Sequence, residues 1–148
     1  MTENKPFGLQ LVIDAHEPHV LADWWAQTLN WTVEPQDEAF IRSMIDQGFA
    51  SLDDTIEHNG ALLWREGSAI NPPDGSPTTG LRLLFQLVPE SKSVKNRVHL
   101  DLRLAGADAA ALRARLLERG ASAIGEGVQG PHTWVVMTDP EGNEFVPD

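Results

Sequence analysis

Two stretches of the chain run through the same order of predicted elements, and this repeat restricts the fold more than any other feature. Residues 10–30 read as a strand, a short loop and a helix, and residues 99–120 repeat that order at almost the same length. Strand-like segments follow the helix in each half. Two copies of strand-helix-strand-strand-strand therefore fit the length of the chain, and such a repeat has to be recognised before a fold is assigned. Gln10 and His99 occupy equivalent positions in the two copies.

The stretch from Arg97 to Leu104 has the clearest pattern of the individual segments. Apolar and polar residues alternate strictly along it. Side chains of a strand point to opposite faces with a period of two, so we expect a half-buried strand over residues 97–104. The residues expected on its apolar face are Val98, Leu100, Leu102 and Leu104, and those on its polar face are Arg97, His99, Asp101 and Arg103.

Apolar spacing and turn residues predict the other elements. Helices are expected over residues 18–29, 38–48 and 108–119, and strands over 7–14, 31–34, 61–65, 81–88, 121–124, 133–138 and 144–146. Residues 71–80 hold three prolines and two glycines and read as a surface loop. We expect a flexible tail over 1–6 and a single domain over 7–148, with one module over about 7–90 and a second over about 95–148.

Composition excludes several kinds of site and partner. The 148 residues contain no cysteine, which excludes disulfides, thiolate metal sites and a cysteine nucleophile. The net charge of −11 argues against nucleic acid as a partner, because phosphate binding needs clustered lysine and arginine. No apolar run is long enough to span a bilayer, and the first residues lack the apolar region of a signal peptide. We therefore expect a cytoplasmic protein without a membrane partner.

Two short motifs match known site patterns but lack the context that those sites need. Residues 125–130 match the glycine-rich string of a dinucleotide-binding loop, yet Pro131 and a strand follow where a helix would have to begin. His16 and His19 lie three residues apart at the start of a helix, a spacing that zinc can use. Pro18 and the exposed first turn favour two surface histidines instead.

Polar side chains on several predicted strands form the main candidate site. His99 has Gln10 as its repeat partner, and Gln86 and Glu144 lie on other strands that can line the same concave sheet. Imidazole, amide and carboxylate ligands suit zinc, manganese, nickel or iron. A metal site needs about three or more good ligands, so a bound metal and a metal-free cleft both stay open.

The tryptophans divide into two groups. Trp24 and Trp25 lie on the apolar stripe of the first helix, together with Val20, and are expected in the core. Trp64 and Trp134 lie in or beside short strands, where they can form the wall of an apolar pocket that binds a ligand.

Three segments carry a resemblance to a known superfamily. They are Leu-Val-Ile-Asp-Ala (11–15) before Leu-Ala-Asp-Trp-Trp (21–25), Lys-Asn-Arg-Val-His-Leu-Asp-Leu (95–102), and Trp-Val-Val-Met-Thr-Asp-Pro-Glu-Gly-Asn-Glu-Phe (134–145). The chain resembles the vicinal oxygen chelate superfamily, which includes glyoxalase I, bleomycin-resistance proteins and extradiol dioxygenases, and it is most similar to actinobacterial glyoxalase-like proteins. The resemblance implies an α+β fold of two βαβββ modules, whose mixed sheet curls around a central cleft, and a homodimer.

The resemblance also implies where a metal would bind. Ligands of the superfamily come from the first and the fourth strand of each module. Gln10 and His99 match the two first-strand positions, and Gln86 lies near the second ligand position. The fourth position falls on Val146, which cannot coordinate a metal, so Glu144, two residues earlier on the same face, is the substitute.

Two functions follow from this resemblance. In the first, Gln10, His99 and Glu144, with Gln86 nearby, hold a divalent ion (zinc, nickel, manganese or iron) that polarises substrate oxygens in a lyase, isomerase or dioxygenase reaction. Glu144 and Asp101 are then the catalytic candidates, with Asp101 or Arg103 supporting proton transfer. In the second, a metal-free cleft sequesters a small molecule, as resistance proteins do. The side chains expected to contact the ligand are Trp64, Trp134 and Arg103.

Overall fold

The computed structural model describes residues 5–73 and 80–148, and the chain divides into two compact units, Met1–Pro89 and Glu90–Asp148. Part of the predicted tail (residues 1–4) and most of the predicted loop (residues 74–79) lie outside the described residues. Within the part that is described, no helix has the length and apolar character to cross a membrane.

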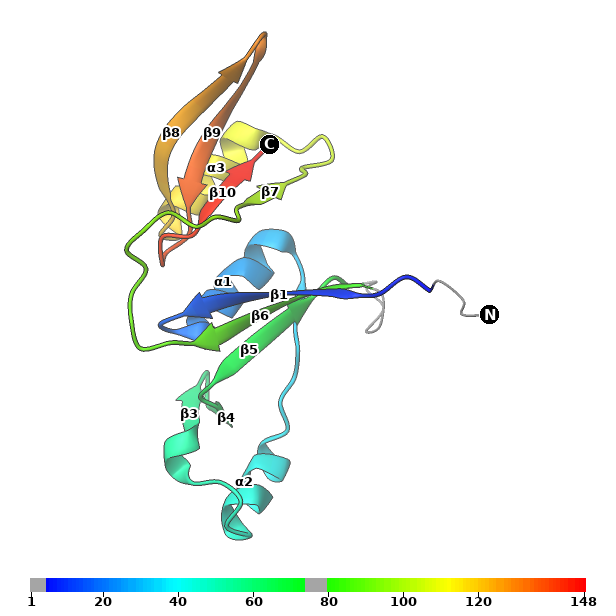
Figure 1. Ribbon diagram of the computed structural model, residues 1–148, viewed down its shortest axis with the longest axis vertical. Helices are drawn as coiled ribbons and strands as arrows, with labels where there is room; N and C mark the ends of the chain where they lie inside the picture. The colour runs from blue at the N-terminus through cyan, green and yellow to red at the C-terminus, as the bar shows by residue number, and fades with distance from the viewer. Residues whose placement is uncertain (1–4, 74–79) are drawn as a thin grey trace. The chain divides into compact units, whose positions relative to one another are not determined.

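The first unit is built on a four-stranded mixed sheet with the strand order β1-β6-β5-β2 (Figure 1). β1 pairs with β6 in parallel, and the other neighbours are antiparallel. A separate hairpin consists of β3 and β4. The elements in chain order are β1 (Leu9–Ala15), α1 (Pro18–Leu29), β2 (Thr32–Val33), α2 (Glu38–Asp46), the short 3-10 helix η1 (Leu52–Asp54), β3 (Thr55–His58), β4 (Ala61–Trp64), β5 (Gly67–Asn71) and β6 (Leu81–Leu87).

The second unit repeats the same arrangement without the extra hairpin. Its sheet has the order β7-β10-β9-β8, and β7 pairs with β10 in parallel. In both sheets the first strand of the unit lies beside the last one. The next-to-last strand follows, and then the second strand of the βαβββ module. The predicted internal repeat and the α+β fold class are therefore confirmed. The elements are β7 (Leu100–Leu102), α3 (Ala109–Glu118), β8 (Ser122–Gln129), β9 (His132–Thr138) and β10 (Glu144–Pro147).

Helix α1 covers one face of the first sheet. It begins with Pro18 in its first turn and ends where Asn30 takes a left-handed φ of 57°. Trp24 and Trp25 are 8% and 1% exposed, as predicted for core residues. Val20, which was expected on the same stripe, is 52% exposed, because α1 presents only one side to β5 and β6.

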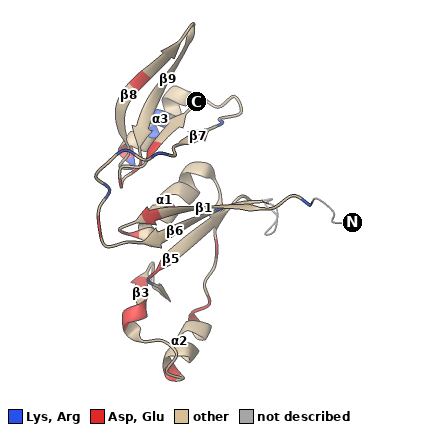
Figure 2. Ribbon diagram, in the orientation of Figure 1, with Lys and Arg blue, Asp and Glu red and all other residues tan. Residues whose placement is uncertain are grey.

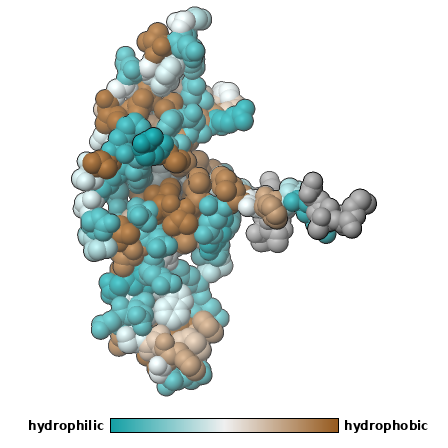
Figure 3. Space-filling view, in the orientation of Figure 1, coloured by the Kyte–Doolittle hydropathy of each residue, from teal (hydrophilic) through white to brown (hydrophobic). Residues whose placement is uncertain are grey.

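The other face of this sheet, which we call the open face, alternates with the buried one along β1 and β6. Phe85 and Leu83 are buried on the helix side, so their neighbours Arg82, Leu84 and Gln86 belong to the open face. In Figure 1, α1 lies behind β1 and β6, so the viewer looks onto the open face. The space-filling view shows apolar side chains gathered over these two strands (Figure 3).

The segment from α2 to β4 is an insertion between the second and third strands of the first module. Acidic side chains are frequent along it (Figure 2). It is tied to the sheet by Gln36, whose Nε2 donates to the Gly67 carbonyl (2.9 Å) and whose Oε1 accepts from the Trp64 N–H (2.8 Å). Glu38 also accepts from the Leu62 N–H at 2.6 Å. The hairpin is therefore fixed at a defined position beside β5.

Several predicted boundaries need correction. The strand expected over residues 97–104 is reduced to Leu100–Leu102, and Val98 is 65% exposed instead of buried. The residues before β7 are held by side-chain bonds instead of a strand ladder, and Ala105 (φ 51°) turns the chain soon after it. The glycine-rich string at 125–130 is mostly strand β8, which confirms that it is no dinucleotide loop.

Candidate functional site

A row of hydrogen-bonded polar side chains crosses the open face of the first sheet. Arg82 on β6 lies opposite Gln10 on β1, and its Nη1 donates to Gln10 Oε1 at 2.6 Å. On its other side Arg82 donates from Nε and Nη2 to the two oxygens of Glu34, at 2.9 and 2.8 Å. Asn71 Nδ2 also donates to Glu34, at 2.9 Å. The row therefore connects β1, β6 and β5 with the residue that directly follows β2.

Arg82 and Glu34 form a two-point ion pair that fixes both side chains. The hydrogen bonds from Arg82 hold the pKa of Glu34 below its usual value, with a further contribution from Asn71 against the opposing effect of burial. The pKa of Arg82 is raised, mainly by the same hydrogen bonds. Both groups are thus charged across the physiological pH range. The guanidinium is about one-third exposed and faces a pocket.

That pocket has a volume of about 540 Å³, which is within the usual range for small-molecule sites. Ala69 and Leu84, which are register partners on β5 and β6, form an apolar floor together with Gly67. We call this cavity the open-face pocket. Its full lining is Glu34, Gln36, Trp64, Glu66, Gly67, Ser68, Ala69, Arg82, Leu84, Gln86 and Leu87.

Trp64 forms part of the wall, and its backbone is fixed on both sides. The carbonyl of Trp64 accepts from Nε2 of His19 on α1, at 2.7 Å. The ring of His19 lies 5.4 Å from that of His58, whose Nε2 pairs with Asp23 at 2.6 Å. His19 is only 5% exposed, so the prediction of two surface histidines is wrong for this one. The carbonyl that accepts this hydrogen bond belongs to a residue 45 positions away, so residues 16–19 alone give no indication of it.

The structure separates the two predicted metal ligands of the first unit. Gln10 is level with Arg82 and Gln86 is level with Asp14, four residues farther along the parallel pair. Four residues of a strand span roughly 13 Å, so these two amides do not bind one ion together. The oxygen of Gln10 already accepts from a guanidinium, and a divalent cation on it would lie beside a positive charge.

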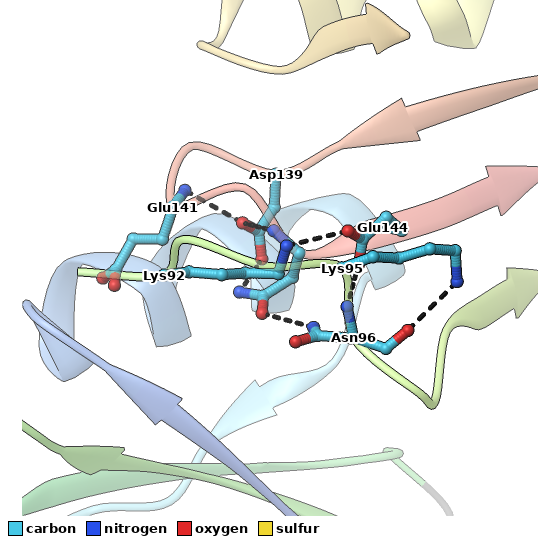
Figure 4. Close-up of polar contacts among 7 residues, drawn as sticks. Lys92, Lys95, Asn96, Asp139, Glu141 and Glu144 are labelled. Atoms are coloured by element: carbon cyan, nitrogen blue, oxygen red, sulfur yellow. Dashed lines mark hydrogen bonds and ion pairs between the residues drawn. The ribbon is translucent and has the colours of Figure 1, made fainter. Parts of the chain in front are cut away.

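In the second unit, the carboxylate of Glu144 is also paired with a cation (Figure 4). Oε1 of Glu144 accepts from Lys92 Nζ at 2.7 Å and Oε2 accepts from the Asn96 N–H at 3.1 Å. Burial raises the pKa of Glu144, but the bonds from Lys92 and Asn96 more than offset this effect, so that its pKa is lowered. The side chain is 8% exposed, and its environment stabilises an ionised structural group.

The turn before β10 belongs to the same cluster. Asp139 Oδ1 accepts from the N–H groups of Glu141 and Asn143, and Oδ2 accepts from Asn143 Nδ2 at 2.9 Å. Asn96 in turn donates to Asn143 Oδ1. These bonds close a tight turn over residues 139–143, with Gly142 at a φ of 91°. Its hydrogen bonds hold Glu144 in place.

Of the other predicted residues in the second unit, His99, Asp101 and Arg103 are exposed and Trp134 is half-buried. His99 precedes β7, and its Nε2 lies 3.5 Å from Asp101 Oδ1, with both side chains more than half exposed. Arg103 follows β7 and lines a separate cavity of about 700 Å³ with Asp101 and Asp148. Trp134 on β9 packs against Gly127, and its ring lies 5.3 Å from that of His132.

These donors do not add up to a metal centre within either unit. Among the residues that the structure describes, no three histidine, aspartate or glutamate side chains are grouped so that they could hold a metal ion. Gln10 and Glu144, two of the oxygen ligands expected from sequence, are each bonded to a cationic side chain. The donor set of each unit, taken by itself, does not fit a divalent cation.

The polar row contains two residues that the sequence interpretation missed, Arg82 and Glu34. Neither residue was assigned to a site from the sequence. Its contact with Gln10 depends on the parallel register between β1 and β6, and the strands lie 72 residues apart at this point. Only the alternation of residues 81–87 could have indicated that Arg82 faces away from the helix.

Comparisons with known proteins identify the fold. The model of the glyoxalase-like domain family matches residues 10–146. No curated protein matches the chain by sequence. A glyoxalase family protein from Bacillus cereus is 14% identical with a TM-score of 0.57, covering 99% of this chain and 96% of its own. Glyoxalase I of Leishmania major, described as trypanothione-dependent, is 12% identical with a TM-score of 0.53. This match covers 94% of the present chain and 83% of the Leishmania chain.

A third solved structure carries the name of the wider superfamily. It is a member of the glyoxalase/bleomycin resistance protein/dioxygenase superfamily from Sphaerobacter thermophilus, 13% identical with a TM-score of 0.50, and it covers 99% of this chain and 98% of its own. At these identities the likeness concerns the fold alone. It agrees with the two βαβββ units described above.

Proposed function

Because the chain belongs to the glyoxalase-like domain family, we propose that it binds a small organic molecule in the open-face pocket, without the help of a metal ion. The observation that carries this proposal is the pocket itself, which combines an apolar floor at Ala69 and Leu84 with Trp64 in its wall and the polar row at one end. Apolar surface supplies most of the affinity in such sites, and a few polar groups fix the orientation of the ligand.

The donor chemistry favours this function over a metal-dependent reaction. Lewis-acid chemistry needs an ion on oxygen or nitrogen donors that are free to coordinate. Here the Gln10 oxygen accepts from Arg82, and the Glu144 carboxylate accepts from Lys92. A cation at either position would have to displace a positively charged side chain. The alternative of the sequence analysis, a metal-free protein that sequesters its ligand, is therefore the one we propose.

The test is to fill the pocket. Leu84→Trp places a bulky ring on the pocket floor, and Val12→Trp places the same ring on the neighbouring strand of the open face, outside the pocket lining. A library of flat aromatic fragments is screened by ligand-observed NMR against the wild type and both variants. We expect fragments that bind the wild type and Val12→Trp but not Leu84→Trp. Equal binding by all three proteins would contradict the proposal.

The resemblance to the superfamily also implies a homodimer, and we include this in the proposal. Light scattering on the full chain measures its mass in solution directly. A mass of twice 16.3 kDa is expected, and a monomer would contradict this part of the proposal without affecting the pocket.

A further inference from the structure

Arg82 offers hydrogen-bond donors that its protein partners do not use. A guanidinium has five N–H groups. Three are accounted for: Nε and one N–H of Nη2 donate to Glu34, and one N–H of Nη1 donates to Gln10. Among the described residues no partner is found for the other two, one on Nη1 and one on Nη2. They are carried by the two terminal nitrogens of the guanidinium.

The partners of Arg82 also fix its direction. Glu34 holds one edge of the guanidinium through two bonds, and Gln10 holds it from the opposite strand. A planar group restrained in this way loses little conformational freedom when it binds a further acceptor. Arg82 lines the open-face pocket, so a bound molecule is within reach of it.

The charges of the pocket select the kind of acceptor. Its lining contains one cation, Arg82, and two carboxylates, Glu34 and Glu66. Glu34 already neutralises the guanidinium at 2.8 Å, and Glu66 adds a negative charge. A second anion would be repelled by both carboxylates, whereas a neutral carbonyl oxygen accepts the two N–H groups without that cost.

We propose that the open-face pocket binds neutral, flat carbonyl compounds and that Arg82 is the residue that selects them, by donating its two remaining N–H groups to the carbonyl oxygen. This inference rests on the proposed function and names the ligand class for the same pocket. Trp64 and the floor at Leu84 contact the apolar body of the ligand. Arg82 thus acts as a specificity residue, whose charge is balanced by Glu34 and whose direction is fixed by Gln10.

Three probes of one shape test the ligand class. Indole has the flat ring system without an oxygen acceptor, oxindole adds one neutral carbonyl, and indole-2-carboxylate adds an anion. Their affinities for the full chain are measured by isothermal titration calorimetry. We expect oxindole to bind about tenfold more tightly than indole, and more tightly than indole-2-carboxylate. Tighter binding of the carboxylate would overturn the assignment of a neutral ligand.

Two variants test the role of Arg82. Arg82→Lys keeps the positive charge but removes the paired N–H groups, and we expect the preference for oxindole over indole to disappear. Arg42→Lys is the control, because Arg42 is an exposed partner of Glu38 on α2 and does not line the pocket. It should keep the preference. Circular dichroism and the thermal midpoint of each variant verify that it is folded.

The outcomes separate this inference from the function on which it rests. If oxindole and indole bind the wild type equally, and Leu84→Trp abolishes both, the pocket binds ligands and only the role of Arg82 is overturned. If none of the three probes binds, both the ligand class and the pocket lose their support. A preference for oxindole that survives in Arg82→Lys assigns the selection to another residue and also overturns the inference.

Discussion

His19 Nε2 lies 2.7 Å from the carbonyl oxygen of Trp64, although the two residues are separated by 45 positions. A carbonyl oxygen can only accept, so Nε2 of His19 carries the hydrogen in this bond. The contact joins the first turn of α1 to β4 of the inserted hairpin. It fixes the backbone that presents Trp64 to the open-face pocket.

His19→Ala should destabilise the first unit because it removes a buried donor and leaves the Trp64 carbonyl without this partner. We expect the free energy of unfolding, measured with urea, to fall by about 1–3 kcal/mol. Gln27→Ala, at an exposed position of the same helix, is the control and should change it by less than about 0.5 kcal/mol. Equal effects of the two substitutions would show that the bond contributes nothing.

The ionised form of Glu144 should stabilise the protein in a pH-dependent manner. Its pKa in the folded state lies below the usual value of 4.5, despite burial, because Lys92 and Asn96 donate to the carboxylate. A lowered folded pKa gives stability that is fully present above the unfolded value and is lost as the pH falls through the folded one. Glu144→Gln should therefore cost about 1–3 kcal/mol at neutral pH and progressively less in acid.

Urea unfolding between pH 7 and pH 3 measures this difference. Glu118→Gln, at an exposed position of α3, is the control and should follow the wild type at each pH. A constant gap between the wild type and Glu144→Gln across that range would contradict the assignment, because the benefit would then not depend on ionisation.

Gly127 makes room for the ring of Trp134, which faces it across the β8–β9 pair. A Cβ added at position 127 would lie 2.0 Å from Cε2 of Trp134, so Gly127→Ala must displace the indole. We expect a loss of about 1–3 kcal/mol in the free energy of unfolding. The near-ultraviolet circular dichroism of the tryptophans should change as well.

Gly125→Ala is a matched control for this substitution. Gly125 lies on the same strand, two residues away, and a Cβ there meets nothing within 4 Å. It should leave the spectrum unchanged and keep or slightly raise stability, because alanine restricts the unfolded chain more than glycine does. A spectral change in both variants would show that the effect is general to β8.

Divalent metals should not stabilise the protein. Zinc, nickel, manganese and iron(II), added singly in excess, are expected to leave the thermal midpoint unchanged, because the oxygens of Gln10 and Glu144 are bonded to Arg82 and Lys92. Calorimetry of the same four titrations provides an independent readout. A stoichiometric binding event that also raises the midpoint would contradict the metal-free function.

Local sequence signals were sufficient for most of the fold. α1 begins and ends at the predicted residues, since Pro18 and the spacing of Trp24 and Trp25 are both features of the local sequence. The hairpin of β3 and β4 was missed although Asn59 and Gly60 are a strong hairpin signal, and both take positive φ values. The residues of β5 show no alternation between buried and exposed positions, because Ser68 and its two successors are all buried.

The candidate site was less accessible to such reasoning. Trp64 was proposed as a pocket wall because a tryptophan in a short strand is a local feature, and the structure places it in the lining of the open-face pocket. The contact between Arg82 and Gln10 requires the register of two strands far apart in the sequence, and the burial of Glu144 requires the loop that carries Lys92. The predicted ligands were therefore judged by residue type, without the cations that occupy their oxygens.

The strand order of the first unit also constrains how it can be made. Among the strands that the structure describes, β1 pairs with β6 alone, and β5 depends on β6 for one of its two pairings. While the chain is being synthesised, β1 and α1 emerge long before the strand that joins them to the rest of the sheet. The backbone of β1 thus gains its described sheet partner only when residues 81–87 are available, so the first sheet cannot form before β6 has been synthesised.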